Sequence, residues 1–276
     1  MKKTVRILHI AIVALCALVV LACLFMLARI FIDYSRDSRV YENVNQGFET
    51  LEELPPVVEI DGLIRVERGL PMTEAMKSQY EYLLELKATY PDVVGFISIP
   101  SVAINYPVVQ TDNNSYYLDH LITGEEGKSG TVFLDCRCDS QASVAKNTVL
   151  YGHNMNNRTM FHNIELLFEK DVFLNATVEY VTEEGIFIYR PLSVYRTDEN
   201  DIFDRYVFAG DEEYLSYCDE IVEKSRFEES LDIFPAADSG VITFVTCTNF
   251  VKTERYIYQA VLEKVYVPES DLGGES

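Results

Sequence analysis

The chain has 276 residues, which is long enough to bury one large hydrophobic core or two smaller ones. Its composition is typical of a folded protein, since 48% of the residues are hydrophobic and the aromatic residues include 18 Tyr and 15 Phe. Acidic residues outnumber basic ones by 44 to 23, for a formal net charge of −21. A surface with this charge repels nucleic acids and anionic lipid headgroups, so we exclude nucleic-acid functions.

The N-terminus differs from the rest of the chain in charge and hydropathy. Residues 1–6 are basic, and residues 7–28 are apolar apart from His9. About 20 apolar residues span a bilayer as a helix, whereas the apolar segment of a secretory signal has about 7–15. We therefore predict a cytoplasmic N-terminus at 1–6, an uncleaved transmembrane signal anchor at 7–28, and an extracellular domain after it. Cleavage of the signal, or lipoprotein-type processing before Cys23, remains an alternative.

Residues 29–72 predict a juxtamembrane stalk or helix, followed by an extended stretch where the Pro55–Pro56 pair excludes a helix. Thr73 then begins a helix that ends before Pro91. An apolar stripe at helical spacing supports this helix: Met76, Tyr80, Leu83 and Leu84.

Beyond this helix the apolar residues recur with a period of two, as they do in β-strands. The candidate strands are rich in Val, Ile, Tyr, Phe and Thr and cover 94–99, 104–109, 131–134, 148–152, 177–181, 186–196, 241–247 and 255–267. One amphipathic helix, 211–227, interrupts them, and its Cys218 lies on the apolar face, where it is predicted to pack. This pattern predicts a mostly β fold with a closed or nearly closed barrel, and a disordered tail at 268–276.

The six cysteines are scattered without metal-ligand spacing. Cys16 and Cys23 lie in the apolar segment, and the others are Cys136, Cys138, Cys218 and Cys247. No second Cys or His pair stands near the Cys-x-Cys at 136–138, so we predict neither a metal site nor a cofactor. We expect mostly free thiols, since a disulfide within this short loop would be strained, although four cysteines could also form two disulfides.

Among the four histidines, His153 is distinguished by its position. His9 lies in the apolar segment, and His120 and His162 are expected to be surface or packing residues. His153 directly follows the strand 148–152, and strand ends that open into loops are where barrels present functional side chains.

A thiol and a guanidinium occupy the two ends of one loop. Cys247 ends the strand 241–247, and Arg255 begins the strand 255–267. If these strands pair as a hairpin, Cys247 and Arg255 face each other, with their Cβ atoms about 4.5–5.5 Å apart. The residues alone therefore predict that both side chains share one site, but they do not say whether His153 joins it. The alternative interpretation is that Cys247 is a buried packing residue and Arg255 a solvated surface residue.

Several stretches resemble the sortase family, and class B sortases in particular. TFVTC at 243–247 resembles the T-L-x-T-C signature, YGHNM resembles the class B His segment, and ERYIYQAVL resembles the Arg strand. GTVFLDCR and INYPVVQTDNNSYYL resemble further parts of the family, and the match runs from about residue 73 to 267. Two features depart from the pattern: Phe244 replaces the usual Leu, and Cys136 and Cys138 fall where no cysteines are expected.

The resemblance implies a membrane-anchored cysteine transpeptidase with an eight-stranded barrel as its catalytic domain, at 73–267. Such enzymes cleave a C-terminal sorting signal of exported proteins through a thioacyl intermediate and pass the product to a peptidoglycan amine. Carried over by position, Cys247 is the nucleophile, His153 the general acid/base and Arg255 the donor to the substrate carbonyl. Val245 and Thr246 are candidate substrate-binding residues, although Thr246 equally fits a structural place in the barrel.

Two alternatives remain open. One is a pilin-polymerising sortase, and such enzymes often carry a lid before the barrel and a second, C-terminal span. A membrane-tethered β-barrel binding module would have a structural cysteine at position 247, and thiol alkylation would distinguish it from an enzyme. The loop 248–254 is expected to influence the choice of substrate.

Overall fold

The computed structural model describes residues 2–48, 62–201, 204–228, 233–248, 251 and 253–272. The extended stretch predicted around Pro55 and Pro56 lies outside the described residues. So do positions 249, 250 and 252 of the loop after Cys247.

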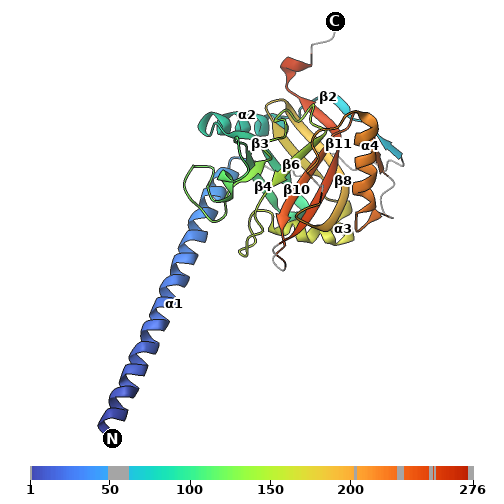
Figure 1. Ribbon diagram of the computed structural model, residues 1–276. Coiled ribbons are helices and arrows are strands. Elements are labelled where there is room, and N and C mark those ends of the chain that lie inside the picture. The colour runs from blue at the N-terminus through green and yellow to red at the C-terminus, as the bar shows by residue number, and fades with distance from the viewer. Residues whose placement is uncertain are drawn as a thin grey trace.

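Eight strands close into a barrel, as predicted (Figure 1). In ring order they are β10 (Val241–Cys247), β6 (Asn147–Tyr151), β5 (Val132–Leu134), β4 (Ile104–Val109), β3 (Val93–Ile99), β7 (Val178–Thr182), β8 (Gly185–Asp198) and β11 (Glu254–Val267). The ring closes because β10 pairs antiparallel with β11 and parallel with β6. A ninth strand, β2 (Glu67–Pro71), extends the sheet beside β11 without entering the ring.

Both faces of the barrel wall are covered, so the strands are buried almost continuously. The first six residues of β10 and the first eleven of β8 are all buried. On the outside, helix α4 (Asp211–Glu223) packs a second apolar cluster against β8, β10 and β11. Cys218 lies in this cluster, 1% exposed, and burial raises the pKa of its thiol to about 12. The prediction that Cys218 is a packing residue is therefore confirmed.

Helix α2 (Glu74–Thr89) confirms the helix predicted after Thr73. Thr73 is its N-cap, and its Oγ1 accepts a hydrogen bond from Met76 N at 3.3 Å. The predicted stripe is wrong in one position, because Leu84 is 39% exposed. The buried face instead follows a spacing of three and four residues: Met76, Gln79, Leu83 and Leu86.

Helix α1 (Lys2–Asn45) is one continuous helix that contains the predicted anchor. By length and composition it is the one helix among the described residues that could cross a membrane. Its last turns lie against the barrel (Figure 1), where Tyr41 and Val44 are buried, and Phe48 just beyond it stacks on Phe96 with ring centroids 3.8 Å apart. The domain boundary predicted at residue 73 thus leaves out core residues that precede it.

The remaining elements are short and were not predicted as strands or helices, except for a turn at His162. They are β1 (Gly62–Ile64), β9 (Ile233–Pro235), α3 (Lys170–Leu174) and the 3-10 segments Pro100–Val102, Tyr116–Leu118, His162–Phe168 and Glu269–Asp271. The last of these differs from the predicted disordered tail, since Lys77 forms an ion pair with Glu269 at 2.8 Å.

Candidate active site

The hairpin of β10 and β11 brings the thiol and the guanidinium together. Cys247, the last residue of β10, is the register partner of Arg255 on β11, as the sequence predicts. Cys247 is exposed, whereas every residue of β10 before it is buried. The hairpin therefore presents the thiol at the open end of the barrel wall.

The parallel pairing of β6 with β10 brings His153 to the same place. Tyr151 is the register partner of Val245, and Gly152 N continues the ladder with a 3.2 Å hydrogen bond to Val245 O. Because the two strands run in the same direction, their carboxyl ends meet at one edge. His153 lies two residues after Tyr151, and Cys247 lies two residues after Val245, so both stand just beyond this last pair.

Gly152 must lack a side chain for His153 to take this position. A Cβ at Gly152 would lie 2.8 Å from the ring of Phe161, which packs against Phe244 with ring centroids 5.5 Å apart. The chain then returns past the histidine, and Phe161 N donates to His153 O at 2.9 Å.

The imidazole of His153 is oriented by a backbone carbonyl. Its Nε2 lies 2.7 Å from Leu118 O. A carbonyl oxygen only accepts, so the proton of the neutral ring is on Nε2 and Nδ1 carries the free lone pair. Nδ1 is therefore the atom that can take a proton.

Two further polar residues connect the histidine loop to the thiol strand. Asn154 Nδ2 donates to Cys247 O at 3.0 Å, and Asn154 Oδ1 lies 2.7 Å from His162 Nδ1. His162 is also 3.4 Å from Glu165. It is thus a packing residue, as predicted, but one that fixes the end of β10 through Asn154.

Arg255 is held by an acidic residue that sequence reasoning missed. Its Nη2 donates to Glu199 Oε2 at 2.7 Å and its Nη1 to Glu254 O at 3.1 Å. Glu199 follows β8, and Glu199 N donates to Thr253 O at 2.7 Å, in the loop that joins β10 to β11. Only the long antiparallel pairing of β8 with β11 reveals this neighbour.

A pocket of about 330 Å³ unites these side chains. Its lining residues are Asn114, Leu118, Phe133, Tyr151, Gly152, His153, Val245, Thr246, Cys247 and Arg255. All five residues predicted from the sequence therefore lie on one pocket. Thr246 Oγ1 is buried and makes no hydrogen bond within the described part of the protein.

The segment DCRCD, residues 135–139, holds two of the residues that line the pocket. Asp135 is fully buried; burial favours its neutral form, but hydrogen bonds from Arg137 outweigh this and lower its pKa. Its Oδ2 accepts from Tyr151 Oη at 3.1 Å, and Cys136 N donates to Asn114 Oδ1 at 2.7 Å. Both Tyr151 and Asn114 line the pocket.

The remaining thiols differ from Cys247 in their surroundings. All six cysteines are free. Cys138 is 7% exposed, its Sγ lies 3.5 Å from Asn147 O, and burial raises the pKa of this thiol to about 11. Among the described residues, no group of three or more His, Cys, Asp or Glu side chains could hold a metal ion.

Comparison with known proteins gives a consistent assignment. The family model of the sortase domain matches residues 97–263. Sortase B of Staphylococcus aureus is 27% identical over 195 residues, which are 70% of this chain and 78% of that protein. Sortase B of Listeria monocytogenes is 29% identical over 167 residues, or 60% of this chain and 66% of that protein.

The solved structures agree. Sortase B from B. anthracis in complex with AAEK1 superposes with a TM-score of 0.66 at 26% identity, and the match covers 85% of this chain and 99% of that one. The chain therefore belongs to the sortase family, and these relatives place it in class B.

Proposed function

We propose that this sortase is a membrane-anchored transpeptidase that cleaves a sorting signal of exported proteins and joins the product to a peptidoglycan amine. The proposal rests on one observation: Cys247, His153 and Arg255 come from the ends of β10, β6 and β11 and line a single pocket. Cys247 acts as the nucleophile, His153 as the general acid/base and Arg255 as the hydrogen-bond donor to the substrate carbonyl.

In the first half-reaction, Cys247 Sγ attacks the carbonyl carbon of the scissile peptide bond. His153 Nδ1 takes the thiol proton and returns it to the leaving amine, so that a C–S bond forms and a C–N bond breaks. Arg255 favours the thiolate through its permanent charge and donates to the developing oxyanion.

In the second half-reaction, an amine attacks the thioacyl carbon. His153 takes the proton of this amine, the C–S bond breaks, and the proton returns to Cys247. Thr246 and Val245 are assigned to binding of the peptide that precedes the cleaved bond, because both line the pocket beside the thiol.

The anchor and the position of the pocket support action at a membrane. Helix α1 is apolar and exposed over its N-terminal part, and we assign residues 7–28 to the bilayer with the catalytic domain outside the cell. The end of β10 that carries Cys247 points toward the side to which α1 extends (Figure 1). In this arrangement the end of β10 lies on the same side of the barrel as the proposed membrane, at which exported proteins emerge.

The proposal is tested with the full-length protein in detergent micelles and a library of internally quenched pentapeptides, including N-P-x-T-N-like and (S/P)-P-x-T-G-like motifs. We expect cleavage of one motif class, and a thioacyl adduct on Cys247 in mass spectra. Cys247→Ala should abolish cleavage, whereas the matched Cys136→Ala should retain it. Full cleavage by Cys247→Ala would refute the assigned nucleophile.

The accepting amine distinguishes the anchoring enzyme from a pilin polymerase. A short peptide that mimics a peptidoglycan stem should resolve the thioacyl enzyme faster than a peptide with a pilin-type lysine.

The binding-module alternative predicts no cleavage and no preferential alkylation of Cys247. The thiol of Cys247 is exposed, whereas those of Cys138 and Cys218 are buried, and this difference favours the enzyme.

A further inference from the structure

Two backbone contacts hold His153, and neither comes from its own strand. Leu118 O accepts from its ring, and Phe161 N donates to its carbonyl oxygen. Leu118 lies in the loop before β5, and Phe161 ends the loop that follows β6. The orientation of the imidazole therefore depends on what fixes these two loops.

The first loop is fixed by the segment Ser129–Thr131. Thr131 N donates to Tyr117 O at 2.9 Å. Gly130, with φ +56°, lies so close that an added Cβ would be 2.4 Å from Tyr117 O and 2.8 Å from Leu118 O. This segment therefore lies directly against the backbone that presents the Leu118 carbonyl to the imidazole.

Helix α1 holds the same segment through two buried side chains. Tyr41 Oη donates to Gly130 O and lies 2.9 Å from Thr131 Oγ1. Asp37 Oδ2 accepts from Ser129 N at 3.1 Å and from Ser129 Oγ at 3.2 Å. Asp37 is fully buried, and Tyr41 is 5% exposed.

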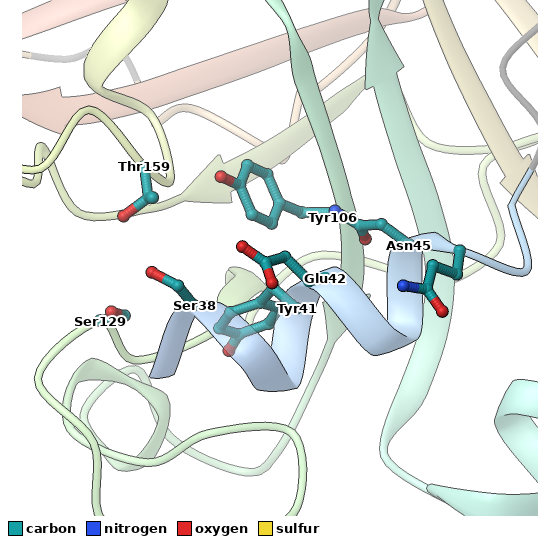
Figure 2. A pocket seen from close by; sticks show the side chains of 8 residues that line it. Ser38, Tyr41, Glu42, Asn45, Tyr106, Ser129 and Thr159 are labelled. Atoms are coloured by element: carbon teal, nitrogen blue, oxygen red, sulfur yellow. The ribbon is translucent and has the colours of Figure 1, made fainter. Parts of the chain in front are cut away.

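The second loop also reaches Tyr41. Tyr106 Oη of β4 accepts from Met160 N at 2.8 Å, beside Phe161. Met160 has φ +58°, a conformation that a non-glycine residue adopts only when its surroundings hold it there. The ring of Tyr41 packs edge-on against Tyr106, with centroids 5.7 Å apart and planes at 80° (Figure 2).

We propose that Tyr41 and Asp37 of the juxtamembrane helix are positioning residues for His153. Tyr41 acts on both loops, through its hydroxyl on Gly130 and through its ring on Tyr106. Helix α1 is then part of the scaffold of the active site as well as the membrane anchor. This inference rests on the proposed role of His153, so its test includes a measurement that does not need activity.

The test compares Tyr41→Phe with Tyr82→Phe in the full chain in micelles. Tyr82 is a matched control, because its Oη donates to Val44 O at 2.6 Å and so also ties α1 to the domain, but away from the loops of His153. Tyr41→Phe should lower kcat about three- to tenfold with KM changed less than twofold. Asp37→Asn should act in the same direction, and Tyr82→Phe should change neither constant.

The independent measurement is the nitrogen NMR spectrum of ¹⁵N-histidine-labelled protein, in which His153→Gln assigns the ring signals. We expect a lower population of the Nε2–H tautomer of His153 in Tyr41→Phe, and the wild-type population in Tyr82→Phe. A wild-type tautomer population in Tyr41→Phe and Asp37→Asn, or equal changes in Tyr82→Phe, would overturn the inference. A tautomer change in a protein without transpeptidase activity would refute only the proposed function.

Discussion

At the scale of single residues, the guanidinium of Arg255 is oriented before any substrate binds. Glu199 and the carbonyl of Glu254 each accept from a different Nη atom, at 2.7 and 3.1 Å. This arrangement fixes the plane of the guanidinium beside Cys247. A donor held in advance stabilises developing negative charge without a cost of reorganisation during the reaction.

Arg255→Lys keeps the charge but loses the planar fork, because an ammonium group cannot occupy both acceptors in this geometry. We expect kcat to fall about a hundredfold, the size typical of losing one oxyanion donor, while the melting temperature changes little. Arg196→Lys is the matched control, since Arg196 lies over the ring of Tyr256 at 4.9 Å and outside the pocket. The measurement is steady-state kinetics of both variants. Wild-type turnover in Arg255→Lys would contradict the assigned role.

The residues of the site were predictable to different degrees. Cys247 and Arg255 could be paired from the sequence because they flank one short loop, and the register confirms it. His153 could be joined to them only through the family resemblance, since the pairing of β6 with β10 joins strands that are far apart in the chain. Glu199 and Leu118 were missed for a similar reason: one depends on the β8–β11 register, and the other acts through its backbone, which no side-chain pattern reveals.

At the scale of elements, the eight strands of the barrel were predictable and the three strands outside it were not. β4 and β10 have the predicted bounds, because their runs of β-branched and aromatic residues end at clear turn residues. β1, β2 and β9 have three to five residues each and all contain Gly or Pro, which are depleted in strands. Their pairing is decided by partners elsewhere in the chain, such as β11 for β2.

The loop between Tyr116 and β5 contains a glycine that cannot be replaced. Gly130 has φ +56°, and a Cβ there would lie 2.4 Å from Tyr117 O, a backbone atom that cannot move independently. Gly124 in the same loop also has positive φ, +80°, but its nearest neighbour would be Tyr116 Oη at 3.9 Å. Substituting each glycine therefore separates two costs: Gly124 tests the backbone conformation alone, and Gly130 tests the conformation together with steric overlap.

Gly124→Ala should lower the free energy of unfolding by about 1 kcal/mol, because only the left-handed conformation is penalised. Gly130→Ala should lower it by about 3 kcal/mol or more, since the loop must also shift away from Tyr117. Urea unfolding of the two variants measures this difference. Equal losses would contradict the close approach of Gly130 to Tyr117 and Leu118.

At the scale of the whole molecule, the apolar N-terminal part of α1 and the barrel are connected by a helix rather than by a flexible linker. Helix α1 runs without a break from Lys2 to Asn45, and Arg36 and Asp33 contact the loop before β5 through Glu126 O and Lys128. The catalytic domain therefore keeps a defined orientation relative to the apolar part of α1. In the proposed membrane arrangement, the pocket would then lie at a fixed height above the bilayer.

The barrel also contains a carboxyl group that makes its stability depend on pH. Glu179 of β7 is fully buried, and burial raises its pKa from 4.5 to about 8. In the folded state it keeps its proton up to about pH 8, whereas in the unfolded chain it loses this proton near pH 4.5. Between these values the folded state binds more protons, so the free energy of unfolding falls as the pH rises.

Glu179→Gln removes this dependence, because the amide has nearly the same shape and does not ionise. We expect the free energy of unfolding of the variant to be close to that of the wild type at pH 5. At pH 8 it should be about 3 kcal/mol higher than that of the wild type, because the buried wild-type carboxyl group costs free energy when it ionises. The measurement is the thermal midpoint of both proteins from pH 5 to 9. Glu183→Gln, which removes one charge from a half-exposed side chain nearby, is the control. A constant difference between Glu179→Gln and the wild type across this range would show that the carboxyl group does not titrate within the barrel as its burial requires.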